Sequence, residues 1–261
     1  MLLKDRPAIV YGAGGAVGGA VAKAFAREGA RVFLAGRTRA KLEAVAAAIE
    51  KAGGRAELAP VDALVPEAIE AHFAGIAGTA GPVRVMFNAI DWGDTQGAPL
   101  TEMAYARFGN HVENALKTWF LTGTAAARHM AANGGGVIIG ITANAGRQAV
   151  PNSGGFAVAC AAVEHFIRQL AIENGPRGVR AVFVRSPGSP DAPGVREAFR
   201  LHAQAQGITP EAFEHNFTKD IPLRRLTPLA QVADAAVLLA SDLAASMTAT
   251  MVNTTGGAQV D

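Results

Sequence analysis

Seven short runs rich in β-branched and other apolar residues recur along the chain, and segments with helical patterning separate them. The runs cover residues 8–11, 31–34, 55–58, 83–87, 136–141, 179–184 and 250–253. Strands that alternate with helices form βαβ units, whose right-handed crossovers put the strands parallel in one sheet with helices on both faces. The chain of 261 residues is therefore predicted to form a single α/β domain, residues 1–261, around a seven-stranded parallel sheet.

The composition agrees with such a fold and excludes several classes of function. Apolar residues make up 50% of the chain and charged residues 18%, which is typical of a sheet covered on both faces by Ala-rich helices. The formal net charge is +2 and the arginines are scattered, so no nucleic-acid partner is expected. No apolar run approaches about 18 residues, and the first strand follows the N-terminus without an apolar leader, so neither membrane insertion nor secretion is expected.

Cysteine and histidine usage gives no sign of a metal site. Cys160 is the only cysteine, so an internal disulfide or a cysteine-based zinc cluster is excluded, and a reducing cytoplasm is the expected location. His111, His129 and His165 fall in helical segments without metal-ligand spacing. We therefore predict no metal.

A glycine-rich turn follows the first strand and leads into a helix expected over residues 20–28. It contains Gly12, Gly14, Gly15, Ala16, Val17 and Gly18. Glycine permits a tight turn there, and the N–H groups of a helix N-terminus attract a pyrophosphate. In a strand–turn–helix setting this pattern predicts a dinucleotide site, whereas the alternative is an ordinary flexible turn. The domain is thus predicted to be Rossmann-type and doubly wound, with its ligand beyond the carboxyl ends of the strands.

The end of the second strand bears on which dinucleotide is bound. An NAD site usually has an acidic residue there, which accepts hydrogen bonds from the ribose hydroxyls. This chain instead has Gly36, followed by Arg37 and Thr38. A guanidinium can form a charge-assisted fork with a 2′-phosphate, so NADP(H) is predicted over NAD(H). The alternative is a surface arginine at the start of a helix.

These motifs and several others resemble the short-chain dehydrogenase/reductase family along the whole chain. Asp62 and Ala63 follow the third strand, where the family has an adenine-contacting aspartate, and Asn88 and Ala89 fall where it has Asn-Asn-Ala-Gly. Pro187 and Gly188 resemble the segment that closes over the nicotinamide. The resemblance implies a cofactor site made by Gly12, Gly14, Gly15, Ala16, Val17, Gly18, Arg37, Thr38, Asp62, Ala63, Asn88, Ala89, Pro187 and Gly188. The chain departs from the family pattern at Ala16, where the middle glycine is expected.

The resemblance also implies a chemistry and the residues that perform it. In this family hydride passes to or from the nicotinamide, a tyrosine exchanges the proton, a lysine activates the tyrosine and a serine hydrogen-bonds the substrate oxygen. Asn114 corresponds to the helix asparagine of the proton relay. Serine, tyrosine and lysine correspond to Ala143, Phe156 and Cys160, which supply neither the hydroxyls nor the ammonium.

The replaced positions predict very slow carbonyl reduction, because loss of a general acid alone costs roughly 10²–10⁴ in rate. Asp91 is the candidate substitute proton donor, on the condition that burial raises its pKa. Thr142, Asn144, Ser153 and Arg185 are also polar residues of this region. For them we favour local roles, in which Thr142 and Ser153 satisfy backbone groups and Arg185 pairs with a carboxylate or points away.

Two functions remain open from the sequence. The first is an NADP(H)-dependent oxidoreductase with an unconventional proton source, or with a reaction such as reduction of an activated C=C bond that needs less help from the protein. The second is a non-catalytic dinucleotide-binding protein that acts as a sensor, a regulator or a partner subunit. A small molecule is the expected ligand in either case.

The segment between the last two strands is expected to cover the site. Residues 189–220 contain no strand pattern and two helical stretches, near 195–206 and 210–217, which together would form a substrate lid. Thr209-Pro210 and Thr227-Pro228 each predict a helix start, with the threonine as N-cap.

The helices that carry Asn114 and Phe156 have apolar residues on more than one face. These are Trp119, Phe120, Val163, Phe166, Ile167 and Leu170. We expect part of this surface to pack against a second copy of the chain, and the family resemblance implies a homotetramer with D2 symmetry, or a dimer built on the same helices.

Overall fold

All seven predicted strands form one parallel sheet in the computed structural model, which describes residues 1–93 and 95–260. The strands are β1 (Pro7–Tyr11), β2 (Arg31–Gly36), β3 (Arg55–Pro60), β4 (Val85–Asn88), β5 (Gly136–Ala143), β6 (Val179–Ser186) and β7 (Met251–Asn253). Their order across the sheet is β3-β2-β1-β4-β5-β6-β7. The strand order reverses between β1 and β4, so the predicted doubly wound Rossmann-type fold is confirmed.

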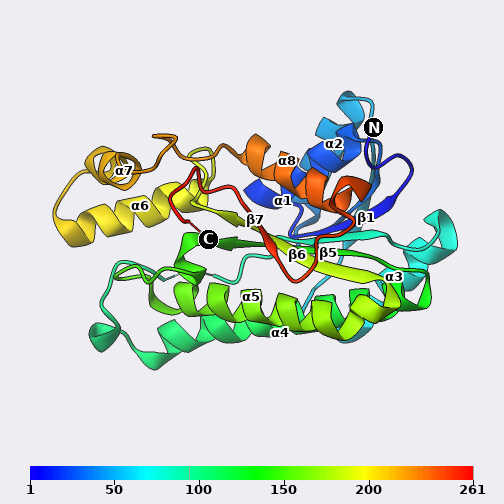
Figure 1. Cartoon of the computed structure of the whole chain (residues 1–261), viewed down its shortest axis with the longest axis horizontal. Helices are drawn as coiled ribbons and strands as arrows, with labels where there is room; N and C mark the ends of the chain where they lie inside the picture. The colour runs from blue at the N-terminus through cyan, green and yellow to red at the C-terminus, as the bar shows by residue number, and fades with distance from the viewer. Residues whose placement is uncertain (94, 261) are drawn as a thin grey trace.

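Helices cover both faces of the sheet (Figure 1). On one face lie α1 (Ala16–Arg27), α2 (Arg39–Lys51) and α8 (Leu229–Ala240), and on the other α3 (Pro66–Ala80), α4 (Tyr105–Ala132) and α5 (Gly154–Asn174). The last two, α6 (Pro193–Gln206) and α7 (Pro210–Thr218), project from the end of the sheet to which β6 leads. This end carries the carboxyl termini of the strands.

Two helix starts differ from the sequence prediction. Helix α1 begins at Ala16 instead of residue 20, because Gly15 already takes the extended N-cap conformation. Helix α8 begins at Leu229, and Thr227 does not cap it, because the Thr227 hydroxyl donates a hydrogen bond to the Thr254 carbonyl at 2.5 Å. The prediction for α7 is confirmed, since the Thr209 hydroxyl accepts a hydrogen bond from the Ala212 N–H at 3.2 Å.

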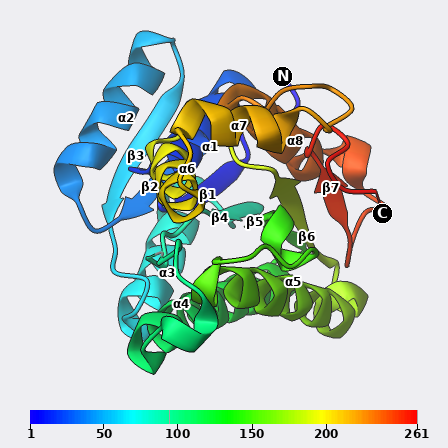
Figure 2. The ribbon, with the colours of Figure 1, turned by 90° about the vertical axis from the view of Figure 1, so that its left-hand side faces the viewer.

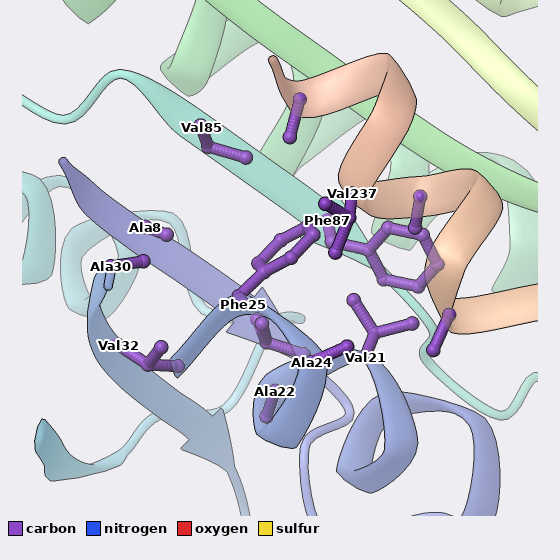
Figure 3. Packing of buried hydrophobic residues seen from close by; sticks show 14 of the residues in the cluster. Ala8, Val21, Ala22, Ala24, Phe25, Ala30, Val32, Val85, Phe87 and Val237 are labelled. Atoms are coloured by element: carbon purple, nitrogen blue, oxygen red, sulfur yellow. The ribbon is translucent and has the colours of Figure 1, made fainter. Parts of the chain in front are cut away.

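Tight packing of α1 on the sheet fixes the turn that precedes it (Figure 3). The Phe25 ring of α1 lies edge-on to the Phe87 ring of β4, with 6.3 Å between the ring centroids. Both rings are fully buried, and Val21 of α1 and Val237 of α8 pack around them. Burial of a Phe side chain stabilises a fold by about 1.5–3 kcal/mol, so this cluster holds α1 and β4 in register.

Helix α5 would be long and apolar enough to span a membrane, judged by length and composition over Gly154–Arg177. In the structure it packs beside α4 against the sheet, and Val163, Ile167 and Leu170 are buried there. Core packing therefore accounts for its apolar character. Trp119 of α4 is buried too, so four of the six residues that suggested an external face belong to the core. Phe120 is exposed, and Phe166 packs against it.

Segment 189–220 forms a helical hairpin in front of the carboxyl edge of the sheet (Figure 2). The rings of Phe199, Phe213 and Phe217 pack together and join α6 to α7. The His202 imidazole of α6 forms a hydrogen bond of 2.7 Å with the Gln96 side chain, which lies in the loop after β4. The predicted absence of a strand in this segment is confirmed.

The side chains of buried Tyr11 and half-buried His72 meet between β1 and α3, and their buried polar atoms have no hydrogen-bond partners among the described residues. Their rings are edge-on, with 6.0 Å between centroids. Burial lowers the pKa of His72 to about 4, because the charged imidazolium loses its hydration.

We predict that His72 makes the fold less stable in mild acid. The unfolded chain binds a proton at His72 below about pH 6.5 and the folded protein does not, so stability falls as the pH drops toward 4. Between pH 7 and pH 5 this loss should reach about 2 kcal/mol, and His72→Leu should remove it. Urea unfolding at both pH values measures it, and His165→Leu, at an exposed position on α5, is the control. Equal pH dependence in wild type and His72→Leu would contradict this account.

Candidate active site

The glycine-rich turn lies against the loop after β4, at the reversal of strand order. Gly12 has a φ of +74°, and a Cβ there would come within 2.2 Å of the Ala89 carbonyl oxygen. A Cβ on Gly18 would come within 2.2 Å of the Gly12 carbonyl oxygen, so α1 also sits directly on the turn. Only glycine fits at either position without displacing the backbone. Ala16 is exposed at the first residue of α1, so its methyl group does not crowd the protein.

The N-terminus of α1 is open to an anion. Gly15 provides no capping side chain, and the first turn of the helix contains no acidic residue. The first N–H groups of a helix have no partner within the helix, and they carry a partial positive charge. The turn therefore fits the pyrophosphate of a dinucleotide on observations of the structure itself.

The structure places the remaining cofactor candidates around this turn at the carboxyl ends of β2, β3, β4 and β6. Arg37 and Thr38 are exposed just after β2, and the Thr38 hydroxyl makes no capping hydrogen bond to α2. The Asp62 carboxylate, after β3, accepts a hydrogen bond from the Leu64 N–H at 3.0 Å, and Ala63 beside it is buried. These residues form a rim beside the N-terminus of α1.

Asn88 shapes the loop after β4 and is itself buried. Its amide donates to the Thr122 hydroxyl at 3.0 Å, and its carbonyl accepts from the Ile90 N–H at 3.0 Å. At the end of β6 the Gly188 N–H donates to the Ser186 hydroxyl at 3.2 Å, and Gly188 has a φ of +98°. Both loops are thus held by local hydrogen bonds.

The three positions at which the family resemblance predicts serine, tyrosine and lysine lie on β5 and α5. Ala143 is the last residue of β5, and Phe156 is in the first turn of α5. Cys160 follows one turn later and is fully buried. A Cβ on Gly146 would come within 3.1 Å of the Cys160 Cβ, so the turn after β5 lies directly on Cys160. The thiol is therefore covered by protein in this structure.

Trp92, in the loop after β4, contacts candidate residues of two helices, α4 and α5. Its ring lies 6.3 Å from the Phe156 ring at an interplanar angle of 37°, and both side chains are half-buried. Its carbonyl oxygen accepts a 3.5 Å contact from the Asn114 amide of α4. The sequence analysis did not identify Trp92, although its position four residues after Asn88, in the loop after β4, could have indicated that it lies at the site.

Asp91 does not meet the condition set for a proton donor. It is exposed, and its carboxylate accepts a hydrogen bond from the Gly93 N–H at 2.9 Å. The burial on which that role depended is absent, so this expectation is corrected. Among the described residues, no group of three or more His, Cys, Asp and Glu residues could hold a metal ion.

A buried ion pair that the sequence analysis missed in part lies beneath the turn after β5. The Arg185 guanidinium of β6 donates to the Glu164 carboxylate of α5 at 2.6 and 3.2 Å, and the Thr142 hydroxyl of β5 donates to it at 2.9 Å. Arg185 and Glu164 are 1% and 4% exposed. The expectation that Arg185 pairs with a carboxylate is therefore confirmed. The sequence did not identify Glu164 as its partner, because α5 is otherwise apolar on this face.

The loop after β4 also carries a hydroxyl–imidazole pair that the sequence did not suggest. The Thr95 hydroxyl lies 2.6 Å from Nε2 of His111, which is three residues before Asn114 on α4. A Cβ on Gly154 would come within 2.5 Å of the Thr95 carbonyl oxygen, so this loop also covers the start of α5. The pair anchors the loop that holds Trp92.

A glycine turn at the N-terminus of a helix, at the reversal point of a parallel sheet, defines a dinucleotide-binding α/β protein. The family model described as enoyl-(acyl carrier protein) reductase matches residues 12–259. The chain belongs to this family and thus to the short-chain dehydrogenase/reductases.

Individual relatives resemble the chain over nearly its whole length. An uncharacterized oxidoreductase, MT0954, of Mycobacterium tuberculosis (strain CDC 1551 / Oshkosh) is 32% identical over 98% of this chain and 92% of its own. A solved 7α-hydroxysteroid dehydrogenase, complexed with NADH and 7-oxo glycochenodeoxycholic acid, is 27% identical with a TM-score of 0.85, over 98% of this chain and 94% of its own. A variant of actinorhodin polyketide ketoreductase with NADPH is 25% identical with a TM-score of 0.87, over 97% of both chains.

The Glu164–Arg185 pair should contribute strongly to stability. Glu164→Gln removes the negative charge from a buried ion pair, and such a change costs about 3–5 kcal/mol. The double variant Glu164→Leu with Arg185→Met should be clearly less destabilised, because no buried charge remains. Urea unfolding measures both. The control is Glu197→Gln, which removes an exposed pair with Arg200 and should leave the midpoint unchanged. A small effect of Glu164→Gln would mean that water reaches the pair.

Proposed function

We propose that this protein is an NADP(H)-binding oxidoreductase of the short-chain dehydrogenase/reductase type in which the family's Ser/Tyr/Lys carbonyl chemistry is lost. The observation that carries the proposal is that Phe156 occupies the tyrosine position, with Ala143 and buried Cys160 at the other two. When bound, the dinucleotide supplies a hydride from its nicotinamide. The chain contributes the turn that holds the pyrophosphate, the loops after β4 and β6, and no hydroxyl at these three positions.

A second candidate function is that of a pseudoenzyme, which binds the dinucleotide and acts as a sensor, a regulator or a partner subunit. Exposed Asp91 and fully buried Cys160 favour it, because neither is placed as a substitute acid. We also propose that the hairpin of residues 189–220 covers the ligand. A cytoplasmic location remains our proposal, supported by the single buried cysteine.

The proposed lack of carbonyl chemistry predicts almost no NADPH-dependent reduction of simple ketones, aldehydes or 3-oxoacyl thioesters, because no side-chain hydroxyl protonates the alkoxide. The triple variant Ala143→Ser, Phe156→Tyr and Cys160→Lys should restore detectable turnover. Phe156→Tyr alone should restore little, because a tyrosine without its lysine keeps a pKa of about 10. NADPH oxidation followed by absorbance measures all three proteins.

Ordinary enzyme rates in the wild type would refute the loss of this chemistry.

The proposed preference for NADPH depends on Arg37, whose guanidinium is exposed beside the cofactor turn. Arg37→Ala should weaken NADPH binding roughly 10- to 100-fold and leave NADH binding nearly unchanged, as expected for loss of a charge-assisted hydrogen bond. Calorimetric titration with both cofactors measures this. Arg39→Ala is the matched control, because Arg39 is equally exposed but pairs with Glu43 at 2.8 Å. Equal affinities of the wild type for NADPH and NADH would remove the NADP assignment.

We further propose a homo-oligomer, a D2 tetramer or a dimer, that packs on α4 and α5. Phe120 and Leu116 of α4 are 58% and 38% exposed, and Ile172 of α5 is 72% exposed. Light scattering should give a mass of at least twice that of the chain. Phe120→Asp should shift the mass toward the monomer, because it places a charge in an apolar contact. A monomer at micromolar concentration in the wild type would contradict this proposal.

A further inference from the structure

Two aromatic rings line the place where the family's proton donor would stand. Trp92 and Phe156 lie 6.3 Å apart and are half-buried, and they come from the loop after β4 and the first turn of α5 at the carboxyl edge. Nε1 of Trp92 is buried and has no hydrogen-bond partner among the described residues, so Trp92 offers ring surface there and not its N–H group. These two rings therefore give this part of the carboxyl edge an apolar surface suited to a flat π-system.

The missing acid restricts which hydride acceptors such a site can reduce. Hydride transfer to a ketone produces an alkoxide, which is about as strong a base as hydroxide. It therefore needs an acid close by as the charge develops. Hydride transfer to a quinone produces an aromatic hydroquinone anion, a phenolate comparable to that of tyrosine, with a pKa of about 10. Water can protonate this product after it forms, without an acid from the protein.

We propose that the site takes quinones, stacked against Trp92 and Phe156, as its hydride acceptors. One quinone oxygen gains the hydride as a new O–H bond, and the ring becomes a hydroquinone monoanion. NADPH loses the hydride with its electron pair and becomes NADP⁺, and water supplies the proton for the second oxygen. The inference rests on the proposed function, because it requires NADPH to bind. It deepens that function by naming an acceptor class that needs neither a tyrosine nor a lysine.

Binding tests the aromatic contact without any turnover. The probe is 2-methyl-1,4-naphthoquinone, titrated by calorimetry into the protein saturated with NADP⁺. We expect saturable binding, and Phe156→Leu and Trp92→Leu should each weaken it at least tenfold. The matched control is Phe166→Ala, another half-buried phenylalanine of α5, which packs on Phe120 instead and should leave the affinity unchanged. No binding of the probe, or equal weakening by Phe166→Ala, would overturn the inference.

Turnover tests the restriction to acceptors that need no acid. NADPH oxidation should be at least 100-fold faster with the naphthoquinone than with cyclohexanone, after the rate without protein is subtracted. Quinone binding without turnover, or equal rates with both acceptors, would refute the reaction. The two levels of proposal fail differently. Absence of NADPH binding would remove the proposed function, whereas NADPH binding without quinone binding would remove this inference alone.

Discussion

The contact between the glycine turn and the loop after β4 is the constraint on which the rest of the site depends. Gly12 lies against the Ala89 carbonyl, and Gly18 lies against Gly12, so the turn, α1 and the β4 loop form one packed unit. A side chain at either glycine would push these elements apart. The Phe25–Phe87 contact holds the same two elements from the core side. The N-terminus of α1 is therefore fixed beside the point where the strand order reverses, which is where we propose that a dinucleotide binds.

A buried ion pair, and not close packing against glycine, holds the other half of the carboxyl edge. Glu164 and Arg185 connect α5 to β6, and Thr142 adds β5 through the same carboxylate. Arg185 immediately precedes Ser186-Pro187-Gly188, and Gly146 packs on Glu164. One buried pair thus fixes both the turn after β5 and the segment after β6. The buried Glu164 carboxylate lies close to Cys160, so a lysine introduced at position 160 would lie near this carboxylate.

Together, the two halves place the proposed cofactor site beside the half-buried rings of Phe156 and Trp92. The turn and the loops retain the features of a dinucleotide site, and the chain belongs to an oxidoreductase family. Beside them lie the rings of Phe156 and Trp92, at the position where the family resemblance implies a tyrosine hydroxyl. Different residues would bind the cofactor and assist the chemical step, so cofactor binding can persist when the residues that assist the chemistry change. The proposals for a quinone acceptor and for a pseudoenzyme both follow from this separation.

The sequence by itself determined the strand and helix alternation, the glycine turn and the residue types at positions 143, 156 and 160. These are local properties, because periodicity, backbone freedom and side-chain chemistry are readable within a few residues. It did not predict that α1 begins at Ala16, that Asp91 is exposed, or that Trp92 meets Phe156. The pairing of Glu164 with Arg185, 21 residues apart, was also beyond it. Only the tertiary structure decided these features, because they depend on which side chains face each other once the helices pack on the sheet.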